Sequence, residues 1–100
     1  MGFISDVMGR KDIDQQGRLL AQQFAKRLSK ERAGDAKRVA AEYQVLLGDA
    51  VGYQRRMSLG FVGKSRLVNA LQWTLVEQGF AEDFARDIGS QLAITLAASE

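Results

Sequence analysis

The sequence contains no cysteine and no histidine. Without cysteine the chain has no disulfide, no thiolate nucleophile and no thiolate metal ligand, so nothing points to an oxidising compartment and a cytoplasmic location is expected. Without histidine it lacks the side chain that most often moves protons near neutral pH, and metal ligation by nitrogen or sulfur is excluded. We therefore expect a protein that is not an enzyme and that holds no metal and no cofactor.

Proline is also absent, and no apolar run approaches the roughly 20 residues that a membrane-spanning helix needs. No basic segment of the signal-peptide type opens the chain, so neither secretion nor a membrane partner is expected. Long stretches free of helix breakers, with no strict period-two alternation, favour helices throughout. A chain of 100 residues has the commonest single-domain size, and we expect one domain over residues 1–100.

Apolar residues recur with helical spacing in five segments. The first predicts a short amphipathic helix over residues 3–8, ended by Gly9, which docks as a flap on the body. Four main helices are expected over residues 13–30, 36–57, 64–78 and 81–98. Because the connections are short, the sequence predicts an all-α fold, a compact antiparallel helical bundle of four main helices plus the short N-terminal helix.

Local signals mark several of these boundaries. Asp35 suits an N-cap, and Gly79 suits a left-handed helix stop with Phe80 folding back on the helix end. Residues 58–63 are expected to form a turn in which Phe61 and Val62 plug the end of the bundle.

The segment Gly63-Lys64-Ser65 has the ending of a phosphate-binding loop. The first glycine of that motif would be at position 58, which is Ser58, and no strand is predicted before it. A glycine at a helix start is therefore the preferred interpretation, and nucleotide hydrolysis is not expected.

The two helices around Gly79 have the layout of a helix-turn-helix DNA reader. The second of them carries Glu82, Asp83 and Asp87 against Arg86 alone, and phosphate would repel such a helix. A plain helical hairpin is the better interpretation.

Charge is unevenly distributed along the chain. Residues 18–66 hold eleven basic and four acidic side chains, a net charge of +7, whereas residues 67–100 have a net charge of −4. If the helix expected over residues 36–57 is continuous, residues eighteen positions apart lie on the same side of it. The sequence therefore predicts a basic band. Its members are Lys37, Arg38, Arg55, Arg56, Lys64 and Arg66. Such a band follows a nucleic-acid backbone or engages an acidic protein, and the alternative is a solvated face with internal ion pairs.

Tyr53 and Trp73 are the aromatic residues that do not fall clearly on an apolar stripe. Tyr53 lies near the edge of its stripe, close to Arg55 and Arg56, and is either a contact residue or a cap over the turn. Trp73 lies almost opposite the core-facing arc of its helix, with Val76 beside it.

Something must cover Trp73, and two explanations stay open. The simpler is that the helix is central and that Phe3 and Ile4 of the N-terminal flap cover its back. The alternative is an exposed anchor flanked by polar residues such as Arg66, used in a homodimer or on a larger partner.

Taken together, these features favour a protein that acts by binding. The main hypothesis is a small helical inhibitor or adaptor that docks on a larger protein or protein–nucleic acid complex; a phage or mobile-element product that blocks a nucleic-acid-targeting defence complex would fit. The alternative is direct nucleic-acid binding through the basic band. The candidate partner-binding residues are Trp73, Val76, Arg66, Lys64, Arg55, Arg56, Tyr53, Lys37 and Arg38.

Overall fold

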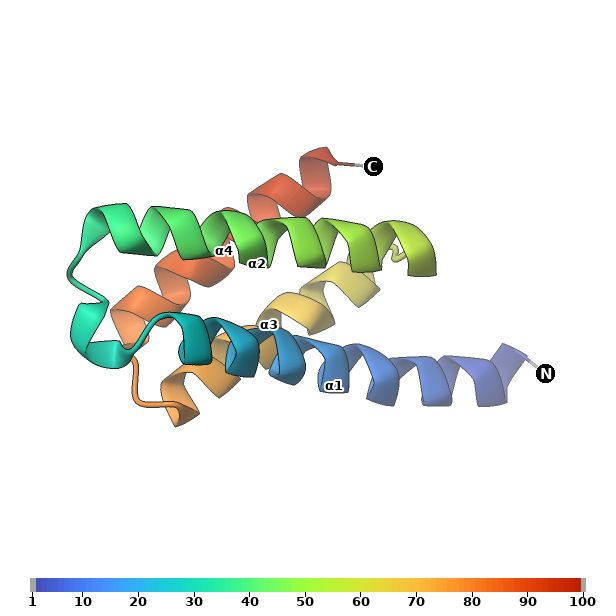
Figure 1. Ribbon diagram of the computed structural model, residues 1–100. Coiled ribbons are helices and arrows are strands. Elements are labelled where there is room, and N and C mark those ends of the chain that lie inside the picture. The colour runs from blue at the N-terminus through green and yellow to red at the C-terminus, as the bar shows by residue number, and fades with distance from the viewer. Residues whose placement is uncertain (1, 100) are drawn as a thin grey trace.

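The described residues form four α-helices and one short 3₁₀ helix, and Figure 1 shows the computed structural model of the chain. The structure describes the backbone of residues 2–99 and the side chains of residues 11–99. In chain order the elements are α1 (Gly2–Arg27), η1 (Lys30–Arg32), α2 (Ala36–Met57), α3 (Phe61–Glu77) and α4 (Glu82–Ala98). The described residues contain no β-strand, and the predicted all-α bundle with four main helices is confirmed.

The helices pair into two antiparallel hairpins (Figure 1). α1 and α2 run side by side in opposite directions, and α3 and α4 form a second pair that crosses behind the first. The α2–α3 turn lies at the same end of the molecule as the start of α1 and the end of α4. One hydrophobic core draws on all four helices. Its largest fully buried side chains are Leu20, Phe24, Leu28, Leu46, Leu67, Leu71, Leu75, Leu92 and Leu96.

α1 and α3 come very close to each other at Gly17. A Cβ atom at this position would lie 2.7 Å from the carbonyl oxygen of Leu67 and 2.8 Å from the Cβ atom of Ala70. No larger residue fits unless the helices move apart, so Gly17 sets the distance between α1 and α3.

The predicted break at Gly9 is not present in α1, which is a single helix from Gly2 to Arg27. The residues expected to form a separate short helix are its first turns. One glycine inside a helix costs only about 1 kcal/mol relative to alanine, and neighbouring helix formers offset that cost.

The first half of α2 is less buried than its sequence predicts. Its apolar stripe places Ala36 and Ala40 toward the core, but both are exposed, and Val39 and Tyr43 are only half-buried. The reason is a groove of about 510 Å³ between α2 and α4, which these residues line. The buried residues of α2 lie from its middle onward, at Leu46, Ala50, Tyr53 and Gln54.

The predicted helix boundaries at Asp35 and Gly79 are confirmed. The Asp35 carboxylate accepts a hydrogen bond from the backbone N–H of Arg38 at 3.3 Å. Gly79 has a φ angle of 101°, and the N–H groups of Gly79 and Phe80 donate to the carbonyl oxygens of Val76 and Leu75. This is the Schellman arrangement that ends a helix, and it buries Phe80.

The start of α3 differs from the prediction. Gly60 is the N-cap and α3 begins at Phe61, one turn earlier than expected. Phe61 and Val62 do not plug the bundle: 85% of Phe61 and 65% of Val62 remain exposed. Because Ser58 takes the left-handed position at the end of α2, the chain turns within residues 58–60 and residues 61–62 begin the new helix.

Candidate functional site

Trp73 is exposed in the C-terminal half of α3. Its side chain is 64% exposed, so it is not a core residue. It lines two depressions, one between α1 and α3 with a volume of about 660 Å³ and a smaller one of about 150 Å³ beside α4. The indole therefore forms part of a ridge between two hollows.

The larger depression, here called the α1–α3 groove, has a charged rim. The residues lining it are Lys11, Asp14, Gln15, Arg18, Arg66, Asn69, Ala70, Trp73, Thr74 and Glu77. Arg66 donates a hydrogen bond from Nη2 to Asp14 Oδ2 at 2.6 Å, which links the walls contributed by α3 and α1. Cations and carboxylates therefore surround the only tryptophan of the chain.

Val76 lies beside Trp73 but has a different environment. It lines the small depression next to Glu82 and Arg86, yet it is half-buried and packs against the core. The cover of Trp73 by Phe3 and Ile4 that the sequence suggested lies outside the residues whose side chains the structure describes.

The predicted basic band divides into two clusters. α2 is one continuous helix, as the band required. Lys37 and Arg38 lie at its start and Arg55 and Arg56 at its end, about 27 Å apart at a rise of about 1.5 Å per residue. Arg66 faces the α1–α3 groove instead, where it pairs with Asp14.

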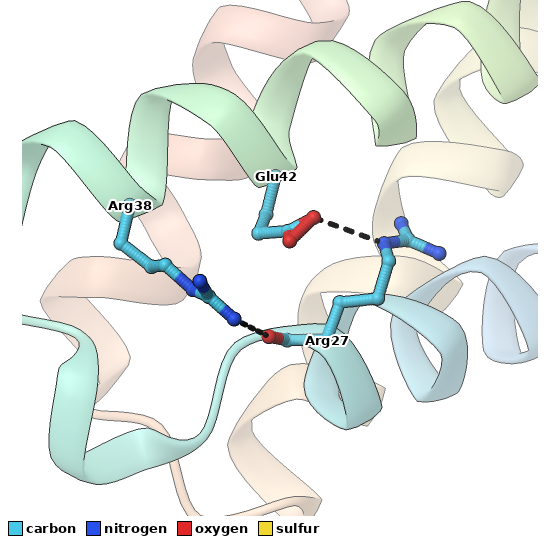
Figure 2. Close-up of polar contacts among 3 residues, drawn as sticks. All are labelled: Arg27, Arg38 and Glu42. Atoms are coloured by element: carbon cyan, nitrogen blue, oxygen red, sulfur yellow. Dashed lines mark hydrogen bonds and ion pairs between the residues drawn. The ribbon is translucent and has the colours of Figure 1, made fainter.

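Arg38 also has a structural role at the first cluster (Figure 2). Its Nη2 group donates to the carbonyl oxygen of Arg27 at 3.4 Å, at the end of α1. Arg27 in turn forms an ion pair with Glu42, with 3.4 Å between Nε and Oε1. These contacts join the two helices of the first hairpin. Arg38, a member of the predicted basic band, is therefore partly engaged in a contact within the protein.

The second cluster surrounds the α2–α3 turn. Arg55 and Lys64 line a hollow of about 450 Å³, and Arg56 lies over the ring of Tyr53 with its Cζ atom 6.0 Å from the ring centre. Tyr53 itself is only 4% exposed, so it is a core residue and not a surface contact. Its hydroxyl donates to Asp12 Oδ2 at 2.9 Å and joins α2 to α1.

The hydroxyl of Tyr53 is expected to make the free energy of unfolding depend on pH in the alkaline range. Burial, the hydrogen bond to Asp12 and the negative charge of Asp12 raise the pKa of Tyr53 from 10.0 to about 12. A group with a raised pKa stabilises the folded state below its unfolded pKa and loses that contribution as pH rises through the folded value. We expect the free energy of unfolding to fall between pH 10 and 12, and to fall less steeply in Tyr53→Phe.

The control for this prediction is Tyr43→Phe, which removes the other tyrosine of the chain. Urea unfolding at several pH values measures the free energy, and an alkaline absorbance titration follows the phenol directly. If Tyr53→Phe has the same slope as the unchanged protein above pH 10, the assignment to Tyr53 is wrong.

Several exposed apolar residues were not recognised from the sequence. Besides Phe61 and Val62, Ile94 on α4 is 70% exposed. The one signal in the sequence that α3 begins at Phe61 is Gly60, which can serve as an N-cap. This signal is weak, because Gly60 has no side chain to cap the helix. The exposure of Ile94 could be predicted from the helical spacing of α4. Ile94 is two positions from each of the buried Leu92 and Leu96, so its side chain points to the other side of the helix.

Other classes of site find no support in the described part of the chain. Residues 11–99 contain no group of three or more acidic side chains placed to hold a metal ion. None of the described helices is both long and apolar enough to cross a membrane. Comparison of the chain with protein-family models, curated proteins and solved structures finds no match.

Proposed function

We propose that this chain is a cytoplasmic, non-enzymatic binding protein that docks on a larger protein, alone or within a nucleoprotein complex, through the surface around Trp73. The observation that carries the proposal is the 64% exposure of Trp73 on a ridge between two depressions. Tryptophan is enriched among the residues that dominate the binding energy of protein interfaces. Because most of the Trp73 side chain is exposed in the free protein, burying it against a partner would gain the free energy of removing that apolar surface from water.

The surroundings of Trp73 suit a protein partner. Interfaces combine an apolar centre with a polar rim, and here Lys11, Arg18 and Glu77 lie around the indole in the α1–α3 groove. The rim carries both signs of charge, with Arg66 already paired to Asp14. A partner segment with polar groups of both signs, placed around an apolar pocket for the indole, would satisfy this surface.

The biological setting is a separate part of the proposal. A small helical chain that acts by occupying a surface is well suited to be an inhibitor or adaptor, and a phage or mobile-element inhibitor of a nucleic-acid-targeting complex is such a case. The homodimer remains a second use of the same surface.

Trp73→Ala tests the proposal. We expect the variant to lose at least about 30-fold in affinity for its partner, since residues of this kind contribute about 2 kcal/mol or more to binding. Its melting temperature should change little, because most of the side chain is exposed. Capture from a host lysate, quantified by mass spectrometry, compares the variant with the unchanged protein.

Ile94→Ala is the matched control, because Ile94 is as exposed as Trp73 but lies on α4. Trp73 is the only tryptophan, so its fluorescence reports the site directly. Binding through this surface predicts a blue shift of the emission and protection from a soluble quencher. A captured protein that leaves the emission unchanged, or that binds Trp73→Ala as well, would contradict the proposal, and a concentration-dependent blue shift of the pure protein would assign the surface to a homodimer.

The second candidate function is nucleic-acid binding along the whole basic band. The observation that favours it is the unbroken α2, which places Lys37 and Arg55 on one side of the helix. A duplex bound along α2 predicts that Lys37→Ala and Arg55→Ala weaken binding equally and reduce its salt dependence equally.

A further inference from the structure

The end of the molecule at the α2–α3 turn has an exposed aromatic ring among cations. We call it the α2–α3 tip and define it by Arg55, Arg56, Phe61, Val62 and Lys64. Phe61 is 85% exposed and Val62 is 65% exposed, so the ring of Phe61 is open to solvent. Trp73 lies twelve residues further along α3, about 18 Å away at a rise of about 1.5 Å per residue, so the tip is separate from the surface proposed above.

The tip is positive for two reasons, which are its basic side chains and the N-terminus of a helix. All the charged side chains that define it are basic, and no acidic residue in the described part of the chain lines its hollow. The N-terminus of α3 adds the positive end of a helix dipole. Its cap, Gly60, has no side chain to accept from the first backbone N–H groups of the helix, which point outward as they do in anion sites.

The hollow next to Phe61 is lined in part by a buried polar side chain. Gln54 lines this hollow of about 450 Å³ and is only 3% exposed. Its Nε2 group donates to the carbonyl oxygen of Ser99 at 3.1 Å, while its buried Oε1 atom has no hydrogen-bond partner. An unpaired buried acceptor is costly, and this oxygen is closed to solvent, so it is not a contact point for a ligand in the hollow.

We infer that the α2–α3 tip binds single-stranded nucleic acid. A base stacks on Phe61, and the phosphates on either side lie near Arg55, Arg56 and the N-terminus of α3. Single-strand binding proteins combine a positive track with aromatic platforms in the same way. This inference goes beyond the proposed function and does not depend on it.

The observations favour a nucleic acid over the other partners that a positive surface attracts. Three exposed apolar side chains, Phe61, Val62 and the neighbouring Met57 at the end of α2, are far fewer than a standard protein interface of about 800 Å² on each side needs. Stacking, in contrast, needs one open ring, and phosphates need only the surrounding cations.

The test is the binding of a fluorescein-labelled adenine oligonucleotide of about 12 nucleotides, followed by fluorescence anisotropy. We expect binding at low salt with a slope of about −2 in log affinity against log salt, for about three neutralised phosphates. Phe61→Ala and Phe61→Leu should both weaken binding by roughly five- to one-hundred-fold, since both remove the ring. Phe61→Tyr, which keeps the ring, should stay within about threefold of the unchanged protein.

Controls separate this inference from its alternatives. Lys37→Ala and Trp73→Ala should leave the affinity unchanged, because neither residue lies at the tip. Arg55→Ala should lower the salt slope by about 0.7. Since Phe61 is 85% exposed, its variants should keep the circular dichroism and melting temperature of the unchanged protein.

Three results would overturn the inference. The first is no binding of the oligonucleotide at low salt. The second is an affinity of Phe61→Leu equal to that of the unchanged protein, which would mean a general polyanion or an apolar contact with an acidic protein. The third is tighter binding to vesicles of anionic phospholipid than to the oligonucleotide, with loss of both on Phe61→Ala, which would assign the tip to a membrane surface.

Discussion

Replacing Phe24 with alanine is expected to lower the free energy of unfolding by about 3 to 5 kcal/mol, the cost of removing a large aromatic side chain from a core. Phe24 on α1 is completely buried. Domains of this size are stable by only about 5 to 15 kcal/mol, so the variant loses between about a fifth and all of that stability.

The size of this effect follows from the position of Phe24 among other aromatic rings. Its ring centre lies 6.0 Å from that of Phe80 and 6.3 Å from that of Phe84, and the latter two rings stack at 5.1 Å. The three rings join the end of α1 to the connection between α3 and α4. Alanine at position 24 would remove the member that the two hairpins share and leave a cavity between them.

The matched control for Phe24→Ala is Phe61→Ala, which makes the same chemical change at an exposed position. Surface substitutions of this kind change stability by about 0.5 kcal/mol or less. Urea unfolding followed by circular dichroism measures both free energies. A loss below about 1 kcal/mol for Phe24→Ala would mean that the three rings do not hold the hairpins together.

The helices and most of their ends could be predicted from local signals, because those signals act within a few residues. Asp35 caps α2, and the Gly79–Phe80 pair ends α3, as its sequence indicates. The apolar spacing of α4 correctly placed Leu92 and Leu96 in the core. In each case the physical cause is contained in one turn of helix or one stripe.

Features that depend on how helices cross were not predictable in this way. The spacing of α2 placed Ala36 on the core side, but the divergence of α2 and α4 leaves it exposed. The sequence left Tyr53 open as a contact residue or a cap over the turn, and its burial became clear only from the approach of α1, which brings Asp12 to its hydroxyl. Periodicity gives the direction in which a side chain points, whereas burial depends on whether another helix is there.

In the candidate site, too, features of a single helix were predictable and contacts between helices were not. Trp73 was recognisable because it lies opposite the stripe of its own helix, and the structure leaves it exposed. The sequence did not reveal the ion pair between Arg66 and Asp14, since the two residues are 52 positions apart. Phe61 was misjudged because the start of α3 depends on Ser58, a non-glycine residue in the left-handed conformation.

Gly17 gives the second large effect, since leucine at this position should cost about 3 kcal/mol or more. The first added atom already meets the carbonyl oxygen of Leu67 at 2.7 Å and the backbone nitrogen of Leu71 at 3.2 Å. Backbone atoms cannot rotate away as a side-chain end can, so α1 and α3 must separate. Gly17→Ala tests the same contact with one carbon atom and should cost about 1 to 3 kcal/mol before any gain in helix propensity.

Gly48 on α2 supplies the matched control, because a Cβ atom there would meet nothing within 4 Å. Gly48→Ala and Gly17→Ala gain the same helix propensity, up to about 1 kcal/mol, so the difference between their unfolding free energies isolates the steric cost at Gly17. The α1–α3 groove should widen in Gly17→Ala, because Asp14 and Arg18 on α1 line it opposite Trp73. We therefore expect Gly17→Ala also to weaken binding at Trp73 under conditions where it remains folded, while equal stability of the two alanine variants would contradict the close packing of α1 on α3.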